Sequence, residues 1–355
     1  MESRKLNGLH TAATVDVHTH FFPDALDDFA ATTGDARWPS LHIDDERRAR
    51  IMRGSDVFRP VASTCWNPEH RIEAMDAAGI DVQVLSPVPI MLTTWAEPNL
   101  AASFARRQNE LLAEAAASAP NRFRWLGSVP LQDADLAVGE LEHGVYLGMS
   151  GVEIGTEVGG RELDDVLLRP FFQAASDLDV AIFIHPTGGG GAIRRQGQPY
   201  EFGIGMLTDT AMAVGALLFG GVLEQFPKLR IGLSHGCGSF AWSYPRLARG
   251  ATMGAPPSVG LDLSRTDALV RRLWVDSLVF DPLHLPVLME RFGADHIVLG
   301  SDFPFYPPSW GGPCEVIDGA ATRGLCTPDE AAAMKASNGL RFLGIESAAP
   351  TPPST

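Results

Sequence analysis

Two histidines one residue apart are the first side chains in this sequence that could do chemistry. The apolar run that begins at Ala13 ends in Asp16-Val17-His18-Thr19-His20. Successive side chains of a β-strand point to opposite faces, so His18 and His20 would share one face. Two imidazoles on one face can bind a single divalent metal ion. Such a pair also occurs by chance. Whether the histidines form a metal site therefore depends on whether other parts of the chain supply further ligands.

Three more side chains suited to metal binding or proton transfer directly follow apolar runs. His185 ends the run 181–185, His235 ends the run 230–235, and Asp302 follows the run 296–300. If these runs are parallel strands of one barrel, their carboxyl ends open on one face, and the five side chains converge there. This convergence favours a functional site over chance.

The chemistry of this set fits one divalent metal ion. Three imidazoles and one carboxylate are suitable ligands for Zn²⁺, with Mn²⁺ as the alternative, and one coordination position stays open. Such an ion lowers the pKa of a bound water and polarises a substrate oxygen. The remaining residue would act as a general acid or base, a role that suits histidine because its ordinary pKa is near neutral pH.

Short apolar runs alternate with longer amphipathic segments along the chain. We expect strands over 13–18, 82–86, 123–129, 151–155, 181–185, 230–235, 273–276 and 296–300. We expect helices over 68–78, 99–119, 131–147, 164–178, 204–226, 239–250, 282–292 and 328–342. Eight strands that alternate with helices predict an α/β fold, a (β/α)8 TIM barrel. A doubly wound open sheet is the alternative, but no G-x-G-x-x-G turn follows the first strand.

The segment 21–67 interrupts this alternation. It contains Trp38-Pro39, a charged run over 44–50 and a Gly54-Ser55 turn, so we expect a small inserted subdomain or lid over the barrel mouth. We expect a single barrel domain over 1–347, followed by a disordered tail over 348–355.

The composition restricts the partners. With 28 Lys+Arg against 43 Asp+Glu, the net charge of −15 argues against nucleic acid and requires local arginines for an anionic substrate. The four cysteines lack CxxC spacing and the N-terminus lacks an apolar signal core, so we expect a cytoplasmic protein with reduced thiols. The apolar run 202–226 contains Asp209 and Glu224, and we expect a buried helix there rather than a membrane span.

Longer sequence blocks resemble a known family. They include Phe58-Arg59-Pro60-Val61, Arg71-Ile-Glu-Ala-Met-Asp76, Val129-Pro-Leu-Gln-Asp133 and Leu299-Gly-Ser-Asp-Phe-Pro-Phe305. With these blocks, the H-x-H motif and the strand-end residues, the chain from Val15 to about Gly344 resembles the amidohydrolase superfamily. The closer resemblance is to its branch of metal-dependent decarboxylases typified by 2-amino-3-carboxymuconate-6-semialdehyde decarboxylase (ACMSD).

The resemblance implies a role for each of these residues. The metal ligands that it implies are His18, His20, His185 and Asp302. His235 would be the acid/base that activates a metal-bound water, and either His235 or Asp302 would supply the proton in a direct protonation of the substrate ring. Arg59 and Arg246 would bind a substrate carboxylate. The resemblance places Arg246 in the neighbouring subunit's site, which implies a homodimer.

The chain departs from the family at two places. Many hydrolytic relatives bridge two metals with a carboxylated lysine at the end of the fourth strand, but no lysine lies near 151–155. We therefore expect one metal, with Glu153 as a polar residue of the barrel interior rather than a carboxylate bridge. After His185, the loop has Gly188–Gly191 where relatives with the muconate substrate carry a Trp-Asp-Met-Met-like segment. The acid that is recognised therefore stays open.

We expect a non-oxidative, metal-dependent decarboxylase (carboxy-lyase) that acts on a small anionic substrate, an unsaturated or aromatic carboxylic acid with amino or hydroxy groups. A hydrolase, lactonase or hydratase of the same superfamily would use the same site without releasing CO₂. A non-catalytic barrel with a structural metal would have no need of His235.

Overall fold

The computed structural model describes residues 13–191, 193–253, 263–306 and 311–345. The tail 348–355, for which the sequence predicts disorder, lies outside these residues.

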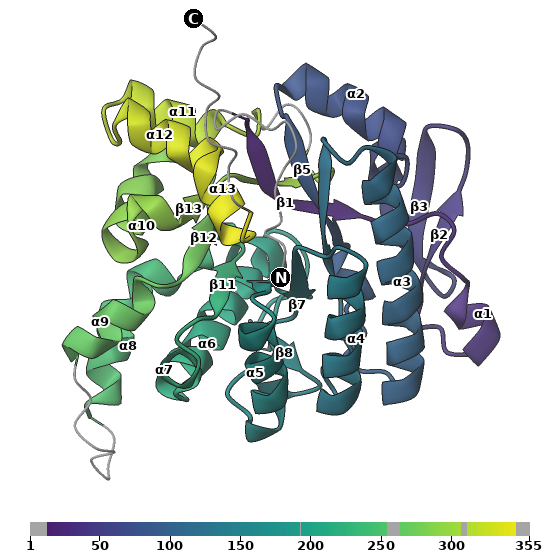
Figure 1. The fold of residues 1–355 in the computed structure, drawn as a ribbon, viewed down its shortest axis with the longest axis horizontal. Helices are drawn as coiled ribbons and strands as arrows, with labels where there is room; N and C mark the ends of the chain where they lie inside the picture. Colours follow the sequence, from purple (N-terminus) through teal and green to yellow (C-terminus); the bar gives the residue numbers. More distant parts are fainter. Residues whose placement is uncertain (1–12, 192, 254–262, 307–310, 346–355) are drawn as a thin grey trace, which may run out of the picture.

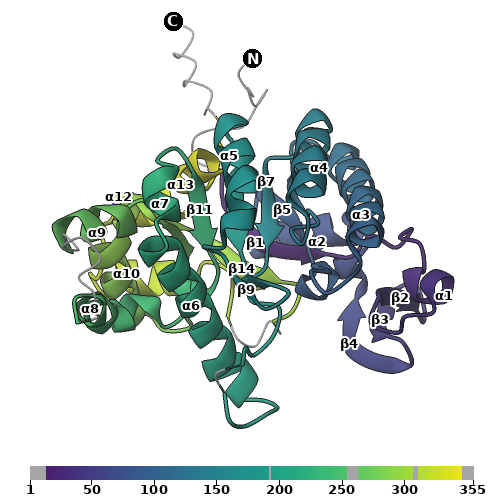
Figure 2. The same cartoon turned by 90° about the horizontal axis from the view of Figure 1, so that it is seen from below.

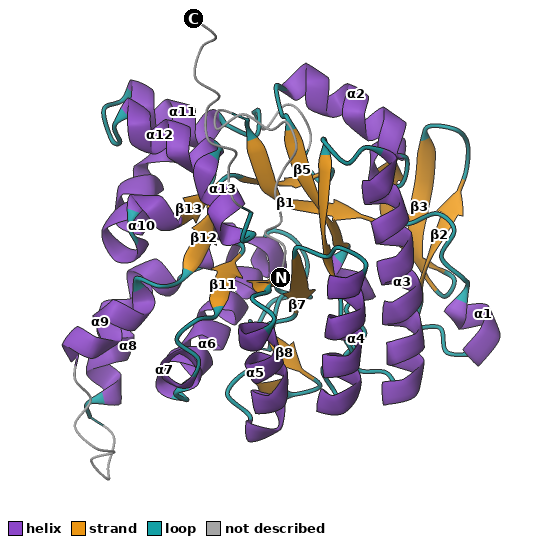
Figure 3. Cartoon of the chain, in the orientation of Figure 1, coloured by secondary structure: helices purple, strands orange, loops and turns teal. Residues whose placement is uncertain are grey.

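A closed sheet of parallel strands forms the centre of the molecule (Figure 3). In chain order, its strands are β1 (Val15–Phe21), β5 (Val82–Pro87), β6 (Phe123–Gly127), β7 (Gly151–Ile154), β10 (Ala181–Ile184), β11 (Arg230–Leu233), β12 (Trp274–Asp276), β13 (Ile297–Val298) and β14 (Gly300–Phe303). Most of these segments are apolar and buried, as in parallel sheets that are covered on both faces.

The eighth barrel strand closes the sheet in two parts, β13 and β14. β13 pairs with β12, and β14 pairs with β1. Between them, the carbonyl of Leu299 accepts a hydrogen bond of 2.9 Å from the Val17 amide. The sheet order follows the chain order around the barrel, so the predicted (β/α)8 barrel is confirmed.

Helices surround the sheet (Figure 1). They are α2 (Pro68–Ala78), α3 (Pro98–Ser118), α4 (Ala134–Tyr146), α5 (Arg169–Asp177), α6 (Met206–Phe219), α7 (Val222–Gln225), α8 (Phe240–Ala251), α9 (Leu263–Val270), α10 (Leu285–Phe292), α11 (Glu315–Thr322), α12 (Pro328–Lys335) and α13 (Ser337–Phe342). The helix expected over 204–226 breaks into α6 and α7 because Gly221 has a left-handed φ of 80°. α9 and α11 had no counterpart in the sequence-based prediction.

The inserted segment after β1 forms its own small sheet. It contains α1 (Phe29–Thr33) and an antiparallel sheet of β2 (Pro39–Ile43), β3 (Arg48–Arg53) and β4 (Asp56–Ala62). Its buried side chains, among them Trp38 and Ile51, pack with Phe104 of α3 and Val88 after β5. Figure 2 shows this sheet beside α3 at the edge of the barrel. A second hairpin, β8 (Glu157–Val158) and β9 (Arg161–Glu162), follows β7.

One helical stretch among the described residues, Glu201–Phe219, is long and apolar enough to cross a membrane by length and composition. Only 33% of it is buried within the chain, so an apolar face of α6 stays exposed. Figure 2 shows α6 extending beyond the barrel.

Candidate metal centre and active-site pocket

Four side chains from three strand ends meet at the mouth of the barrel. They are His18 and His20 of β1, His185 directly after β10, and Asp302 of β14. All four are buried, and one donor atom of each lies within 4.8 Å of the donor atoms of the other three. The structure therefore brings together the four residues that the sequence analysis selected as a ligand set.

Hydrogen bonds orient two of these imidazoles toward a common centre. Nδ1 of His20 donates to the Pro87 carbonyl at 2.8 Å, and Nδ1 of His185 donates to the Pro186 carbonyl at 2.8 Å. Since a carbonyl only accepts, each Nδ1 carries the proton, and each Nε2 of the neutral ring presents a lone pair. Burial lowers the pKa of both imidazoles, which favours the neutral form.

The lone pair on Nε2 of His20 and the Asp302 carboxylate are close enough to repel one another. Nε2 of His20 lies 2.8 Å from Oδ1 of Asp302 and 3.3 Å from Nε2 of His18. The buried Nε2 of His185 has no hydrogen-bond partner among the described residues. A carboxylate oxygen and imidazole lone pairs at these distances favour a shared cation, and nitrogen and oxygen donors of this kind suit one divalent metal ion.

A fifth buried residue, Asp276 at the end of β12, holds the centre in place. Its carboxylate accepts a hydrogen bond of 2.6 Å from Nδ1 of His18 and bonds of 2.9 Å and 2.8 Å from the amides of His235 and Gly236. Burial alone would raise the pKa of Asp276, but the bonds from His18 and the turn hold it below its ordinary value. The sequence analysis assigned Asp276 no role, although a carboxylate that ends the seventh apolar run was the available signal.

The charge state of His18 follows from its partner. Burial alone would lower the pKa of His18, but the hydrogen bond to Asp276 and the charge of Asp302 raise it to about 9. In the metal-free protein, His18 is therefore an imidazolium at neutral pH. A metal ion that binds Nε2 must displace its proton.

His235 lies beside the four donors without joining them. Its ring centroid is 5.0 Å from that of His185 and 5.4 Å from that of His18, and its buried Nε2 has no hydrogen-bond partner among the described residues. Burial, followed by the charge of His18, lowers the pKa of His235 to about 4. A neutral imidazole with a free nitrogen at the edge of the cluster is a suitable proton acceptor.

Two of the five described non-glycine residues with left-handed backbone angles lie at this site. His235 and Asp302 both have left-handed φ angles, 57° and 56° respectively. Non-glycine residues rarely adopt this conformation, and where they do, the surrounding contacts must hold it. The amide bonds of the His235 turn to Asp276 are such contacts.

A pocket of about 530 Å³ opens above the centre, with His20, His185, His235 and Asp302 at its base. Its walls are largely apolar, with Phe58, Val88, Ile90, Phe202, Phe305 and Tyr306 among the lining residues. Arg59 of β4 also lines this pocket and is the cationic side chain among its lining residues. Arg246 is exposed on α8 and does not line the pocket of its own chain.

Glu153 of β7 is fully buried in the barrel interior and lies outside the four-donor cluster. Oε2 of its carboxyl group is 3.9 Å from Nδ1 of His20, the nitrogen that faces away from the cluster. Burial raises the pKa of Glu153 well above its ordinary value, which favours the neutral acid. This placement matches the interior polar residue that we expected.

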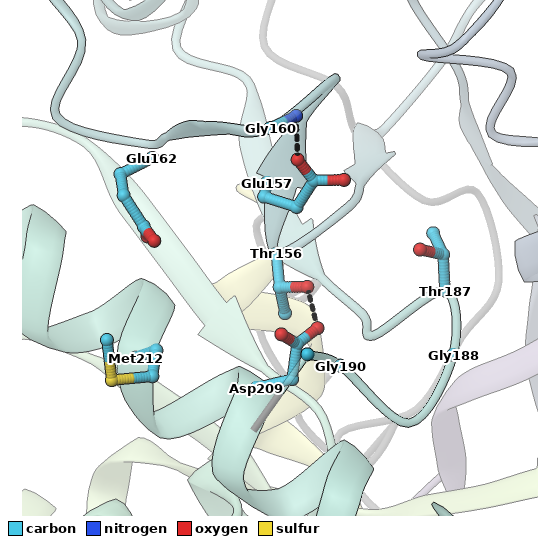
Figure 4. A pocket seen from close by; sticks show the side chains of 10 residues that line it. Thr156, Glu157, Gly160, Glu162, Thr187, Gly188, Gly190, Asp209 and Met212 are labelled. Carbon is cyan, nitrogen blue, oxygen red and sulfur yellow. Dashed lines mark hydrogen bonds between the residues drawn. The ribbon is translucent and has the colours of Figure 1, made fainter. Parts of the chain in front are cut away.

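A neighbouring pocket of about 480 Å³ shares Thr187 with the first and is lined by carboxylates (Figure 4). Glu157, Glu162 and Asp209 line it, with the Thr156 hydroxyl donating to Asp209 and the Gly160 amide donating to Glu157. Three carboxylates repel an anion, so a carboxylate ligand would favour the pocket that contains Arg59.

Comparisons with known proteins agree with this site. A family model described as Amidohydrolase matches residues 15–345. The 2-amino-3-carboxymuconate-6-semialdehyde decarboxylase of Dictyostelium discoideum is 32% identical over 333 residues, which are 94% of this chain and 92% of that protein. The gamma-resorcylate decarboxylase of Rhodococcus jostii (strain RHA1) is 28% identical over 310 residues, which are 82% of this chain and 88% of that protein.

Solved structures share the fold. The 5-carboxyvanillate decarboxylase of Novosphingobium aromaticivorans, complexed with manganese and 4-hydroxy-3-methoxy-5-nitrobenzoic acid, has a TM-score of 0.73 and 19% identity, covering 97% of this chain and 99% of that one. By the family match and the sequence relatives, the chain belongs to the amidohydrolase family, within its branch of ACMSD-like metal-dependent decarboxylases.

Proposed function

We propose that this protein is a mononuclear, metal-dependent decarboxylase that releases CO₂ from an unsaturated or aromatic carboxylic acid without redox chemistry. The observation that carries the proposal is the arrangement at the barrel mouth. His18, His20, His185 and Asp302 form one buried donor set, and His235 adjoins it with a free nitrogen. The named relatives act on acids of this class.

The residues divide the reaction between them. Arg59 binds a carboxylate or another anionic group of the substrate, since a guanidinium offers two parallel hydrogen bonds. The apolar walls hold a flat unsaturated ring and exclude water. When bound, the divalent ion supplies a positive centre that stabilises the negative charge of the transition state. As the C–C bond breaks, its electron pair stays on the substrate carbon, CO₂ leaves, and that carbon takes up a proton.

His235 manages that proton through Nε2. In the hydration route, a neutral His235 takes a proton from water and passes it to the substrate carbon, the hydroxide adds to the neighbouring carbon of the double bond, and that hydroxide leaves again as CO₂ is expelled. In the direct route, either a protonated His235 or Asp302 supplies the proton to the substrate carbon. The lowered pKa of His235 keeps its ring neutral at neutral pH, which is the form that can accept a proton. Asp276 does not touch the substrate in this proposal. It orients His18 and the turn that carries His235.

Zn²⁺ is the metal we propose, with Mn²⁺ as the alternative. Three imidazoles and one carboxylate suit zinc. The manganese in the Novosphingobium aromaticivorans structure supports the alternative. Metal content of the protein purified without added metal, measured by mass spectrometry, distinguishes the two.

The enzyme would act as a homodimer through the exposed face of α6 and α8. Trp242 of α8 is 85% exposed and Met212 of α6 55%, and two more exposed apolar side chains flank these helices, Ile204 before α6 at 55% and Met253 after α8 at 83%. Arg246 is exposed on the same helix as Trp242. A second copy that covers this face would bring the partner's Arg246 toward the first copy's pocket.

The test is a screen of metal-loaded protein against amino- and hydroxy-substituted benzoates and muconates, with CO₂ as the readout. The proposal expects CO₂ release from at least one such acid, abolished by a chelator. If no acid releases CO₂ while lactones are opened, the protein is a hydrolase of the same family.

A further inference from the structure

One aromatic ring connects the metal cluster to Arg59. The Phe305 ring stacks on the imidazole of His20, with centroids 5.3 Å apart and planes at 26°. The guanidinium carbon of Arg59 lies 4.4 Å from the centroid of the same ring. The Arg59 guanidinium forms no ion pair among the described residues. Its stack on the Phe305 ring is therefore the contact that fixes its place.

The backbone alone positions Arg59 loosely. Arg59 lies on β4, an edge strand of the inserted sheet, opposite Ile51 and next to a shift in the strand register. Since side chains alternate along a strand, Arg59 shares a face with the buried Val61 and points toward the barrel. A long side chain in this position needs a lateral contact to hold one rotamer.

Phe305 is itself fixed to the metal cluster. Its amide donates a hydrogen bond of 3.0 Å to the carbonyl of Asp302, three residues earlier. Its side chain also packs against the buried cluster of the inserted sheet. The ring therefore contacts both the loop that carries a proposed metal ligand and the subdomain that carries Arg59.

We propose that Phe305 is a positioning residue that sets the place of the Arg59 guanidinium relative to the metal centre. Its flat face holds the guanidinium plane by a cation–π contact and leaves the N–H edge for a substrate carboxylate. This inference rests on the proposed function, because it assumes that Arg59 binds the substrate carboxylate.

The experiment measures binding rather than turnover. Salicylate is titrated into the Mn²⁺-loaded protein by calorimetry for wild type, Phe305→Leu, Arg59→Ala and the double variant. Phe305→Leu should weaken salicylate about three- to tenfold, the range of a partly buried cation–π contact. In the double variant, the loss should equal that of Arg59→Ala alone, because the ring acts only through the guanidinium.

Two further variants serve as controls. Phe305→Tyr keeps the aromatic face and should restore wild-type binding. Trp95→Leu removes another ring that stacks with an arginine, Arg37 at 4.2 Å, but lies outside the pocket, and it should leave salicylate affinity unchanged. Mn²⁺ affinity should be the same in all variants. If Phe305→Leu does not fold, Phe305→Met replaces it in the cycle.

Additive losses in the double variant, or an equal loss in Trp95→Leu, would overturn the inference. So would salicylate binding that does not depend on Arg59. The two proposals fail separately. If the losses of salicylate affinity are coupled but no acid releases CO₂, only the decarboxylase function is contradicted. If an acid releases CO₂ but the losses of affinity are additive, only the role of Phe305 is contradicted.

Discussion

At the scale of single residues, His235 differs from the proposed metal ligands in where its imidazole lies. The Nε2 atoms of His18 and His20 approach each other and Asp302, whereas His235 lies beside this group. Removing His235 should therefore affect proton transfer and leave metal binding intact.

We expect His235→Gln to retain its metal within about twofold and to lose about 10²- to 10⁴-fold in kcat, the usual contribution of general acid–base catalysis. Metal content and initial rates of CO₂ release measure the two effects. His284→Gln, at an exposed histidine, is the matched control and should behave as wild type. Loss of metal from His235→Gln would instead make His235 a ligand.

His18 makes metal affinity depend on pH. Its pKa is about 9 in the folded, metal-free protein, above the ordinary value of 6.5. The charged ring stabilises the metal-free fold fully below pH 6.5, and this stabilisation is lost as the pH rises through 9.

Metal binding must displace this proton, so affinity should rise by about tenfold per pH unit between pH 6.5 and 8.5. Competition with a chelator of known proton affinity at several pH values measures this slope. A flat profile would show that His18 is neutral before the metal binds.

At the scale of elements, strand ends bring the site together and one carboxylate connects them. Asp276 at the end of β12 bonds to His18 of β1 and to the turn after β11. These segments are far apart in the sequence; in the barrel, β11 and β12 are neighbours, and only the eighth strand separates β12 from β1.

Asp276→Asn keeps the shape of the side chain but removes its negative charge. One carboxylate oxygen becomes an NH₂ group, which faces hydrogen-bond donors of His18 or of the His235 turn. We expect metal affinity to fall about 10- to 100-fold, as for other residues that orient a ligand. The free energy of unfolding should fall by about 1–3 kcal/mol because buried donors lose their acceptor. Chelator competition and urea unfolding measure the two effects.

Asp295→Asn is the control for this variant, since Asp295 is a carboxylate that pairs with a histidine, His296, away from the metal cluster. It should leave metal affinity unchanged. Equal metal affinity in Asp276→Asn and wild type would remove Asp276 from the metal centre.

At the scale of the whole molecule, α6 and α8 expose an apolar face that the proposed homodimer would cover. If a second copy covers it and each Arg246 serves the other subunit's site, two inactive variants should complement each other. We expect Arg246→Ala and His235→Gln proteins, mixed after mild dissociation, to recover about a quarter of wild-type activity, because half of the dimers form one intact site.

Arg249→Ala changes another exposed arginine on α8 and is the control for Arg246→Ala. It should keep full activity without mixing. Absence of complementation, with both variants dimeric by light scattering, would place Arg246 outside the neighbouring site.

The barrel and the convergence of its strand-end residues could be predicted from the sequence alone; those residues are His18, His20, His185 and Asp302. Both follow from local patterns, because apolar runs of strand length alternate with helices and a parallel barrel opens every strand end on one face. The inserted subdomain could be predicted for the same reason, since 21–67 departs from that alternation.

The side chains that support these residues become apparent only in the folded structure. The hydrogen bond between Asp276 and His18, and the contacts of Phe305 with Arg59 and His20, join segments separated by tens to hundreds of residues. Their distances depend on how the strands and the inserted sheet pack, which no local pattern records. The break at Gly221 and the exposed position of Arg246 likewise emerged only from packing, because helical periodicity says where apolar faces lie and not what covers them.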